Sequence, residues 1–227
     1  MGNLSLTKKT VKDIDVKNKR VIVRVDFNVP LDDRGHITDD YRIKKAIPTI
    51  KYLLEHNAKV ILCSHLGRPE GKIDKKFSLD PVAERLGRLL GKEVRFAQDC
   101  IGEEALQASA EIKSGEILLL ENLRFHAEEE NNDPAFAQSL AKLADIYVDD
   151  AFGVIHREHA SLVGITKFLP SVAGLLVEHE INTITEVMEN PKRPLMAVIG
   201  GAKIGDKIEI LNRLIDIADF VAIGGAM

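Results

Sequence analysis

A short segment, VIVRVDFNVP (residues 21–30), places polar residues where a buried strand is expected. The polar positions, each two apart, are Arg24, Asp26 and Asn28. Residues two apart in a strand share a face, so these side chains would project together while the apolar residues between them pack on the other face. A cation, an anion and an amide in one row could bind an anionic ligand or one another.

Polar residues or glycines also end nearly every other apolar run of the chain. They are Ser64, His65 and Arg68; Glu121, Asn122 and Arg124; Asp149 and Asp150, with His156 and Arg157 beyond; and Gly200, Gly201 and Lys203. Ligands of open parallel sheets bind at the carboxyl ends of the strands, and guanidinium groups match carboxylate and phosphate oxygens. The sequence therefore predicts a site for a highly anionic small molecule, with Asp26 and Asn28 contacting a hydroxyl group or holding an arginine.

A single arginine at a strand end is more often part of a surface salt bridge than of a site. For Arg24 the sequence favours such a structural role, as the partner of Asp26 or of a later acidic residue. His156 and His159 are three apart, a spacing that can hold a metal ion on a helix. No third ligand is evident, and no metal site is expected at these histidines.

The segment GGAKIGDK (residues 200–207) follows an apolar run and opens an amphipathic one. Its glycines would let backbone N–H groups approach phosphates. Lys203 and Lys207 would both lie near the start of a helix, where the helix dipole disfavours cations. The segment is neither a Walker loop nor a dinucleotide GxGxxG motif, so phosphate binding and a tight turn both remain open.

The apolar runs alternate with amphipathic segments along the whole chain. Strands are expected at 21–29, 59–66, 94–97, 117–123, 146–152, 195–201 and 220–225, and helices near 42–56, 80–90, 102–113, 133–144, 175–190 and 203–217. This alternation indicates an α/β fold, a parallel Rossmann-like sheet with helices on both faces in three layers. Asp80-Pro81 and Asp133-Pro134 are expected to be an N-cap followed by the first helical residue, and 126–135 to be a solvated loop.

The helix expected at 175–190 is followed by PKRP, which indicates a domain junction. Residues 1–174 would form one domain, 175–190 an interdomain helix, and 191–227 a single β-α-β unit. Such a unit is too small to be stable alone and has two open edges. It is therefore expected to be the beginning of a second α/β domain that continues past Met227.

The composition points to no macromolecular partner. The net charge is −4, which gives no overall attraction to nucleic acid or to anionic membranes. Cys63 and Cys100 are too few for a disulfide framework or a zinc site, which suits a reducing compartment. The first residues lack the apolar core of a signal peptide, and no apolar run approaches the length of a membrane span. A cytoplasmic protein is expected.

Seven longer motifs of the chain resemble those of the phosphoglycerate kinase family, in the same order and at similar spacing. They are RVDFNVPL, ITDDYRI, SHLGRPEGK, LENLRFH, DAFGVIHREHAS, GGAKIGDKI and IGGAM. The resemblance implies two α/β domains joined by a helix, one for 3-phosphoglycerate and one for the nucleotide. It further implies a monomeric glycolytic enzyme that transfers a phosphoryl group reversibly from 1,3-bisphosphoglycerate to ADP, giving 3-phosphoglycerate and ATP with Mg²⁺.

The same motifs imply residue roles. Arg42 and Lys203 would be the catalytic residues, and Lys207 would bind a nucleotide phosphate. The implied substrate-binding residues are Asp26, Phe27, Asn28, Arg42, His65, Leu66, Gly67, Arg68, Arg124 and Arg157. The implied nucleotide-binding residues are Gly201, Ala202, Lys203 and Lys207, and no protein ligand for a metal is implied.

This chemistry fits a site made of arginines and lysines. The acceptor carboxylate is already ionised near neutral pH, so no general base is needed. The chain departs from the family pattern at Asp149, Val154 and Ile155, and it stops in IGGAM, so little or no kinase activity is expected of these 227 residues. A non-catalytic anion-binding module is the alternative, and a dehydrogenase is disfavoured because no GxGxxG follows the first strand.

Overall fold

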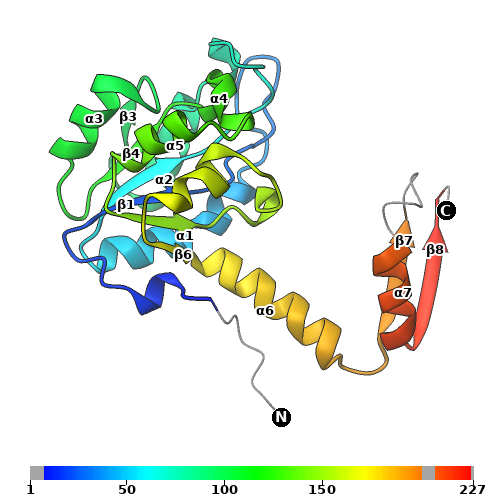
Figure 1. Cartoon of the computed structure of the whole chain (residues 1–227). Helices are drawn as coiled ribbons and strands as arrows, with labels where there is room; N and C mark the ends of the chain where they lie inside the picture. Colours follow the sequence, from blue (N-terminus) through cyan, green and yellow to red (C-terminus); the bar gives the residue numbers. More distant parts are fainter. Residues whose placement is uncertain (1–7, 201–207, 226–227) are drawn as a thin grey trace. The chain divides into compact units, whose positions relative to one another are not determined.

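The computed structural model describes residues 8–200 and 208–225. Two compact units divide these residues, one of Lys8–Glu178 and one beginning at His179. Figure 1 shows the elements of each unit. We describe the units separately.

A sheet of six parallel strands forms the centre of the first unit. The strands are β1 (Arg20–Arg24), β2 (Lys59–Cys63), β3 (Arg95–Ala97), β4 (Ile117–Leu120), β5 (Ile146–Asp149) and β6 (Ser171–Ala173). Their order across the sheet is β3-β4-β2-β1-β5-β6. Leu62 pairs with Val23 on one side and with Leu119 on the other, which fixes the register at the centre. The parallel sheet confirms the predicted fold class, although β6 was not among the expected strands.

Helices cover both faces of this sheet (Figure 1). They are α1 (Tyr41–Glu55), α2 (Asp80–Leu90), α3 (Gly102–Glu111), α4 (Ala127–Glu130) and α5 (Pro134–Ala141). Short 3₁₀ turns lie at Val11–Asp13 (η1), Lys75–Phe77 (η2), Leu123–Phe125 (η3), Phe152–Val154 (η4) and Ile165–Lys167 (η6), and η5 (Ala160–Gly164) is a π-helical turn. The expected loop at 126–135 is wrong in part, because its glutamates form α4.

The alternation of strand side chains explains the two hydrophobic layers. Val21 and Val23 of β1 pack in one apolar cluster with residues of α1 and α2. Ile22, between them, packs in a second cluster on the other face with residues of α3 and α5. Because both faces are covered, the central strands are apolar throughout, as parallel strands usually are.

Two helix starts follow the expected chemistry to different degrees. Asp133 caps α5, accepting hydrogen bonds from the backbone N–H groups of Ala135 and Phe136 at 2.9 Å each. Asp80 is not an N-cap but the first residue of α2, so that expectation was wrong. The preceding backbone N–H, that of Leu79, instead donates to the Glu121 carboxylate at 2.8 Å, which ties α2 to the end of β4.

The second unit contains a parallel pair of strands, β7 (Met196–Gly200) and β8 (Phe220–Gly224), and the helix α7 (Ile208–Ile217). Helix α6 (Leu175–Glu189) begins in the first unit and continues into the second. These elements form the predicted β-α-β unit. Within the described residues, no helix is both long and apolar enough to cross a lipid bilayer.

Candidate functional site

The polar segments that follow four parallel strands lie together, at the carboxyl ends of those strands. Asp26 and Asn28 follow β1, His65 follows β2, Arg124 follows β4, and Arg157 lies beyond β5. Because β4, β2, β1 and β5 are neighbours in this order, their carboxyl ends lie side by side. Residues far apart in the sequence therefore meet at the place where such sheets bind ligands.

His65 marks the centre of this region. Its side chain is buried, and burial lowers its pKa to about 2, with the neighbouring side chains of Arg24, Arg124, His159 and Arg157 acting in the same direction. We call these five residues the basic cluster. His65 is therefore a neutral imidazole at physiological pH, and the charged side chains of Arg24, Arg124 and Arg157 lie near it.

Arg24 is completely enclosed, with 1% of its surface exposed. Its Nε donates to the Ser161 hydroxyl at 2.9 Å, its Nη2 lies 3.1 Å from His65 Nδ1, and its Nη1 contacts the carbonyl oxygen of Val25. The expected pairing with Asp26 is wrong. The link to an acidic residue is indirect, because the Ser161 hydroxyl also donates to the buried Glu129 carboxylate at 2.5 Å.

Arg124 and Arg157 each hold a buried donor that lacks an acceptor. Arg124 donates from Nη1 to the Gly67 carbonyl oxygen at 2.9 Å, and its Nη2 lies 3.1 Å from Glu130. In the described part of the chain, the Nε atoms of both arginines are buried without a hydrogen-bond partner. Leaving such donors unpaired costs free energy, so both Nε–H groups remain able to donate to an added acceptor.

A hydrogen-bonded scaffold orients Arg124. The side-chain oxygen of Asn122 accepts from the backbone N–H of Arg124 at 3.0 Å and from that of Leu66 at 3.2 Å. The side-chain oxygen of Asn28 accepts from the Gly67 N–H at 2.8 Å. Gly67 has φ +63°, and a Cβ there would lie 2.3 Å from the Phe77 ring. Only glycine fits this turn, which joins the ends of β1, β2 and β4.

Asp26 forms an ion pair with Arg42 at the start of α1. The Asp26 side chain is nearly buried, whereas 47% of the Arg42 side chain is exposed. Gly153 of η4 packs on this pair, since a Cβ there would lie 2.7 Å from Asp26 Oδ2. Asp26 thus holds an arginine, one of the two roles expected for it, and leaves part of the Arg42 guanidinium open to solvent.

The remaining predicted residues lie in other surroundings. Phe27 and Leu66 are buried in the apolar cluster beneath the edge, so their side chains support the site rather than face it. Arg68 is exposed, and its side chain has no ion pair within residues 8–200 and 208–225. The predicted nucleotide-binding residues Gly201, Ala202, Lys203 and Lys207 lie outside the described residues.

Sequence reasoning missed Ser161, which accepts a hydrogen bond from Arg24, and Glu129, which accepts one from Ser161. Nothing in a charged segment or a single serine indicates that these side chains are buried. Sequence reasoning also gave Asp150 no role. Asp150 is buried at the start of α6, where its Oδ1 accepts from the Leu176 N–H at 2.9 Å. Burial raises its pKa to about 6.

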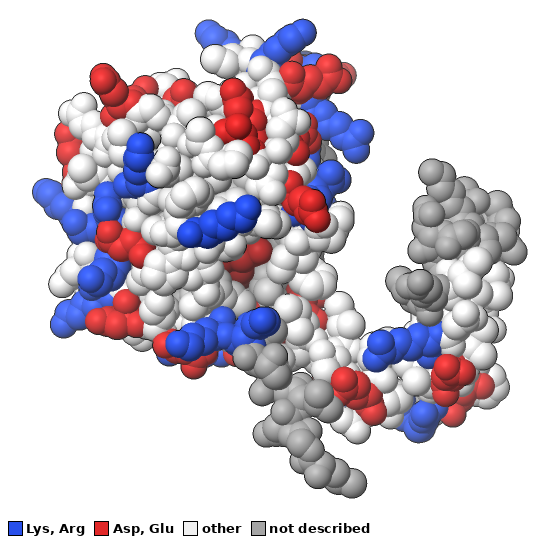
Figure 2. Space-filling model, in the orientation of Figure 1, with Lys and Arg blue, Asp and Glu red and all other residues white. Residues whose placement is uncertain are grey.

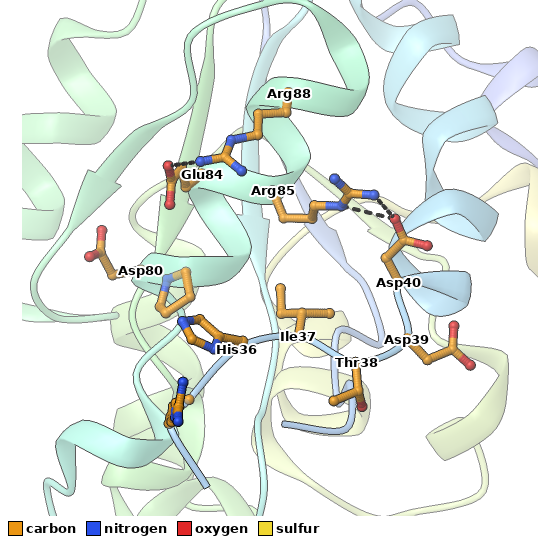
Figure 3. A pocket seen from close by; sticks show the side chains of 12 residues that line it. His36, Ile37, Thr38, Asp39, Asp40, Asp80, Glu84, Arg85 and Arg88 are labelled. Atoms are coloured by element: carbon orange, nitrogen blue, oxygen red, sulfur yellow. Dashed lines mark hydrogen bonds and ion pairs between the residues drawn. The ribbon is translucent and has the colours of Figure 1, made fainter. Parts of the chain in front are cut away.

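A cavity of 660 Å³ lies elsewhere, between residues 34–40 and α2 (Figure 3). Its charged side chains largely pair with one another: Arg85 with Asp40, and Arg88 with Glu84 (Figure 3). Because these charges are already matched, the cavity attracts an anion less than the basic cluster does. The surface seen in Figure 2 likewise mixes Lys and Arg with Asp and Glu among the described residues.

Comparison with known proteins places this geometry in a family. The family model described as phosphoglycerate kinase matches residues 11–227. Phosphoglycerate kinases of Desulforudis audaxviator and Moorella thermoacetica are 56% and 54% identical over 222 residues, which is 98% of this chain and 56% of each relative. The chain therefore spans about half the length of these curated relatives.

Solved structures agree with the sequence matches. Phosphoglycerate kinase from Coxiella burnetii superposes with a TM-score of 0.83 at 39% identity, covering 96% of this chain and 54% of that one. The enzyme from Pyrococcus horikoshii gives a TM-score of 0.85 at 36% identity, with coverages of 96% and 55%. The motifs, the parallel sheet and these likenesses together show that the chain belongs to the phosphoglycerate kinase family.

Proposed function

We propose that the protein transfers a phosphoryl group between 1,3-bisphosphoglycerate and ADP, and that the basic cluster binds 3-phosphoglycerate. The unpaired buried Nε donors of Arg124 and Arg157 are the observation that carries this proposal. 3-Phosphoglycerate offers a phosphate and a carboxylate, and the oxygens of either group satisfy guanidinium donors.

The exposed part of Arg42 supports a role beside the transferred phosphoryl group. The ion pair with Asp26 restrains the guanidinium without covering it. The acceptor carboxylate of 3-phosphoglycerate is already ionised, so the reaction needs no general base. Catalysis can rest on holding the two substrates in line and on stabilising the charge of a loose transition state.

The second substrate would be ADP or ATP, bound by Gly201, Ala202, Lys203 and Lys207, with Lys203 at the transferred phosphoryl group. Mg²⁺ would arrive as part of this nucleotide substrate, held by phosphate oxygens. The net charge of −4 gives no overall attraction to nucleic acid or anionic membranes, and we infer no partner of either kind. We infer a monomeric, cytoplasmic enzyme of glycolysis.

Calorimetric titration of the chain with 3-phosphoglycerate tests the proposal. We expect binding that weakens as salt is added, because charges drive it. Arg124→Met and Arg157→Met should each weaken binding about 10- to 100-fold, the loss of one charge-assisted hydrogen bond or more. Arg88→Met is the matched control, since Arg88 is exposed and paired with Glu84 away from the cluster. A folded wild-type sample that gives no heat, or equal losses in the control, contradicts the proposal.

A further inference from the structure

A second group of polar side chains lies beside the basic cluster and takes no part in the proposed reaction. Asp99 and Cys100 form the turn between β3 and α3, and His126 follows η3 at the end of β4. Strands β3 and β4 are parallel neighbours, with Ala97 opposite Leu120. Their carboxyl ends therefore bring the three side chains together, and one ligand atom from each lies within 4.8 Å of the others.

Hydrogen bonds orient the three groups before any ligand binds. Asp99 Oδ1 lies 2.7 Å from His126 Nε2 and accepts from the Cys100 backbone N–H at 2.6 Å. The His126 ring packs beside Phe136, with the ring centroids 5.4 Å apart. Cys100 is completely buried, while the side chains of His126 and Asp99 are 25% and 45% exposed. The thiol is therefore enclosed, whereas the imidazole and the carboxylate are partly open to solvent.

The three side chains supply the groups that a divalent ion needs. The Asp99 carboxylate attracts a cation, and a thiol such as that of Cys100 loses its proton on coordination. No other group of three or more possible ligand residues lies as close together in the described part of the chain.

We propose that Asp99, Cys100 and His126 bind a divalent transition-metal ion of the Zn²⁺ class, with water in the fourth position. A sulfur, an imidazole nitrogen and a carboxylate oxygen form the mixed set that Zn²⁺ and Co²⁺ accept, whereas Mg²⁺ requires oxygen ligands. Tetrahedral coordination at ordinary zinc distances needs ligand atoms roughly 3.3–3.7 Å apart, so a shift of about 1 Å would close the site. The ion replaces the hydrogen bond between His126 and Asp99 and releases the Cys100 proton to solvent.

Titration of the metal-free chain with CoCl₂, followed by optical absorption, tests this site. We expect one Co²⁺ per chain, a thiolate-to-cobalt charge-transfer band and the strong visible bands of a tetrahedral ion. ZnCl₂ should displace the Co²⁺, and calorimetry in buffers of different ionisation enthalpy should detect about one released proton. Zn²⁺ should also raise the melting temperature of the wild-type chain.

Single-residue variants distinguish Co²⁺ binding at this site from Co²⁺ binding by other side chains of the chain. Cys100→Ser should abolish the charge-transfer band, and His126→Gln and Asp99→Asn should each weaken Co²⁺ binding at least tenfold. Cys63→Ala, at the other buried cysteine, and His36→Gln, at an exposed His–Asp pair, are matched controls that should bind normally. If Cys100→Ser does not fold, the two variants at the more exposed ligands decide. Absence of binding, an octahedral spectrum without charge transfer, or a band that survives in Cys100→Ser overturns the proposal.

Discussion

The six-stranded sheet and the β7–β8 pair contain strands of similar composition in different surroundings. Val60, Ile61 and Leu62 of β2 are completely buried. Val198 of β7 and Phe220 of β8 are 76% and 63% exposed. Apolar sequence alone therefore predicts a strand but not its burial, which in the larger sheet comes from the helices packed on both faces.

Two aspartates show what this difference does to charge. Asp150 in the larger unit accepts a hydrogen bond from the Leu176 N–H, and Asp219 in the smaller unit accepts one from the Leu195 N–H. Burial raises the pKa of Asp150 to about 6, whereas the hydrogen bond from Leu195 and the Arg193 side chain lower the pKa of the exposed Asp219. Burial outweighs the hydrogen bonds at Asp150, whereas the hydrogen bonds from Leu195 and Arg193 dominate at the exposed Asp219.

The largest effect should come from Arg24→Met. This change removes the donors to Ser161 and His65 and leaves the Ser161–Glu129 pair buried without the guanidinium, which should cost about 3–5 kcal/mol of unfolding free energy. Arg193→Met, at an exposed ion pair with Asp219, is the control and should change stability far less. Denaturant unfolding, with hydrogen exchange to assign the loss to each unit, measures both. If Arg24→Met were as stable as wild type, the buried arginine of the larger unit would contribute no more to stability than the exposed arginine of the smaller one.

Next in size is the difference between two apolar truncations. Leu62→Ala creates a cavity in a fully buried layer and should cost about 2–5 kcal/mol. Val198→Ala removes a largely exposed side chain and should stay within about 0.5 kcal/mol. Hydrogen-exchange protection of each strand gives the two values. A large loss at Val198 would mean that β7 is buried in solution.

Asp150→Asn should have a smaller effect that depends on pH. The raised pKa means that folding favours the protonated form, so the wild-type chain loses stability as the pH rises from about 4 through about 6. The amide of the variant does not titrate, and the variant should therefore gain on wild type over this range, by about 3 kcal/mol at most. Melting curves at pH 4, 5, 6 and 7.5 measure the difference.

Asp219→Asn supplies the opposite control for this pH series. Its pKa is lowered by folding, so the wild-type aspartate adds stability that is present above its ordinary pKa and disappears in acid. That loss falls below about pH 4, so from pH 4 to 7.5 Asp219→Asn should keep a nearly constant difference from wild type, whereas Asp150→Asn should gain on it. Parallel pH dependence in both would refute burial as the cause.

The smallest expected effect concerns His65. Because its pKa is lowered to about 2, the imidazole stays neutral between pH 6.5 and 8. His65→Gln should weaken 3-phosphoglycerate binding by the same factor at every pH in this range. The measured quantity is the dissociation constant of the variant divided by that of wild type, in which the ionisation of the ligand cancels. Calorimetric titrations of both proteins give the two constants. A ratio that rises toward low pH would show a protonated His65.

Much of the fold could be predicted from sequence because its signals are local. Continuous apolar runs and helical periodicity located seven of the eight strands and every long helix among the described residues. The strand β6 is as short as β3, but Pro170 before it and Gly174 after it make its segment resemble a turn. The glutamates of α4 look like a solvated loop, and only the fold shows that Glu129 is buried.

The candidate site was predicted less completely because its contacts are not local. The positions of Arg124 and Arg157 at strand ends follow from the sheet, and so the sequence could indicate an anion site. The contact of Arg24 with His65 joins residues 41 positions apart, and its bond to Ser161 spans 137. No pattern in the sequence distinguishes these partners from the nearby Asp26.

Gly174 limits which sequences this fold can explore. A Cβ at this position would lie 2.1 Å from Asp150 Oδ1, so even alanine displaces the carboxylate that caps the first turn of α6. Any larger residue at position 174 therefore requires the Asp150 side chain to move or to change first, whereas Asp150 can change while Gly174 stays. In random libraries of the chain, variants that replace Gly174 should also replace Asp150, but variants that replace Asp150 can keep Gly174.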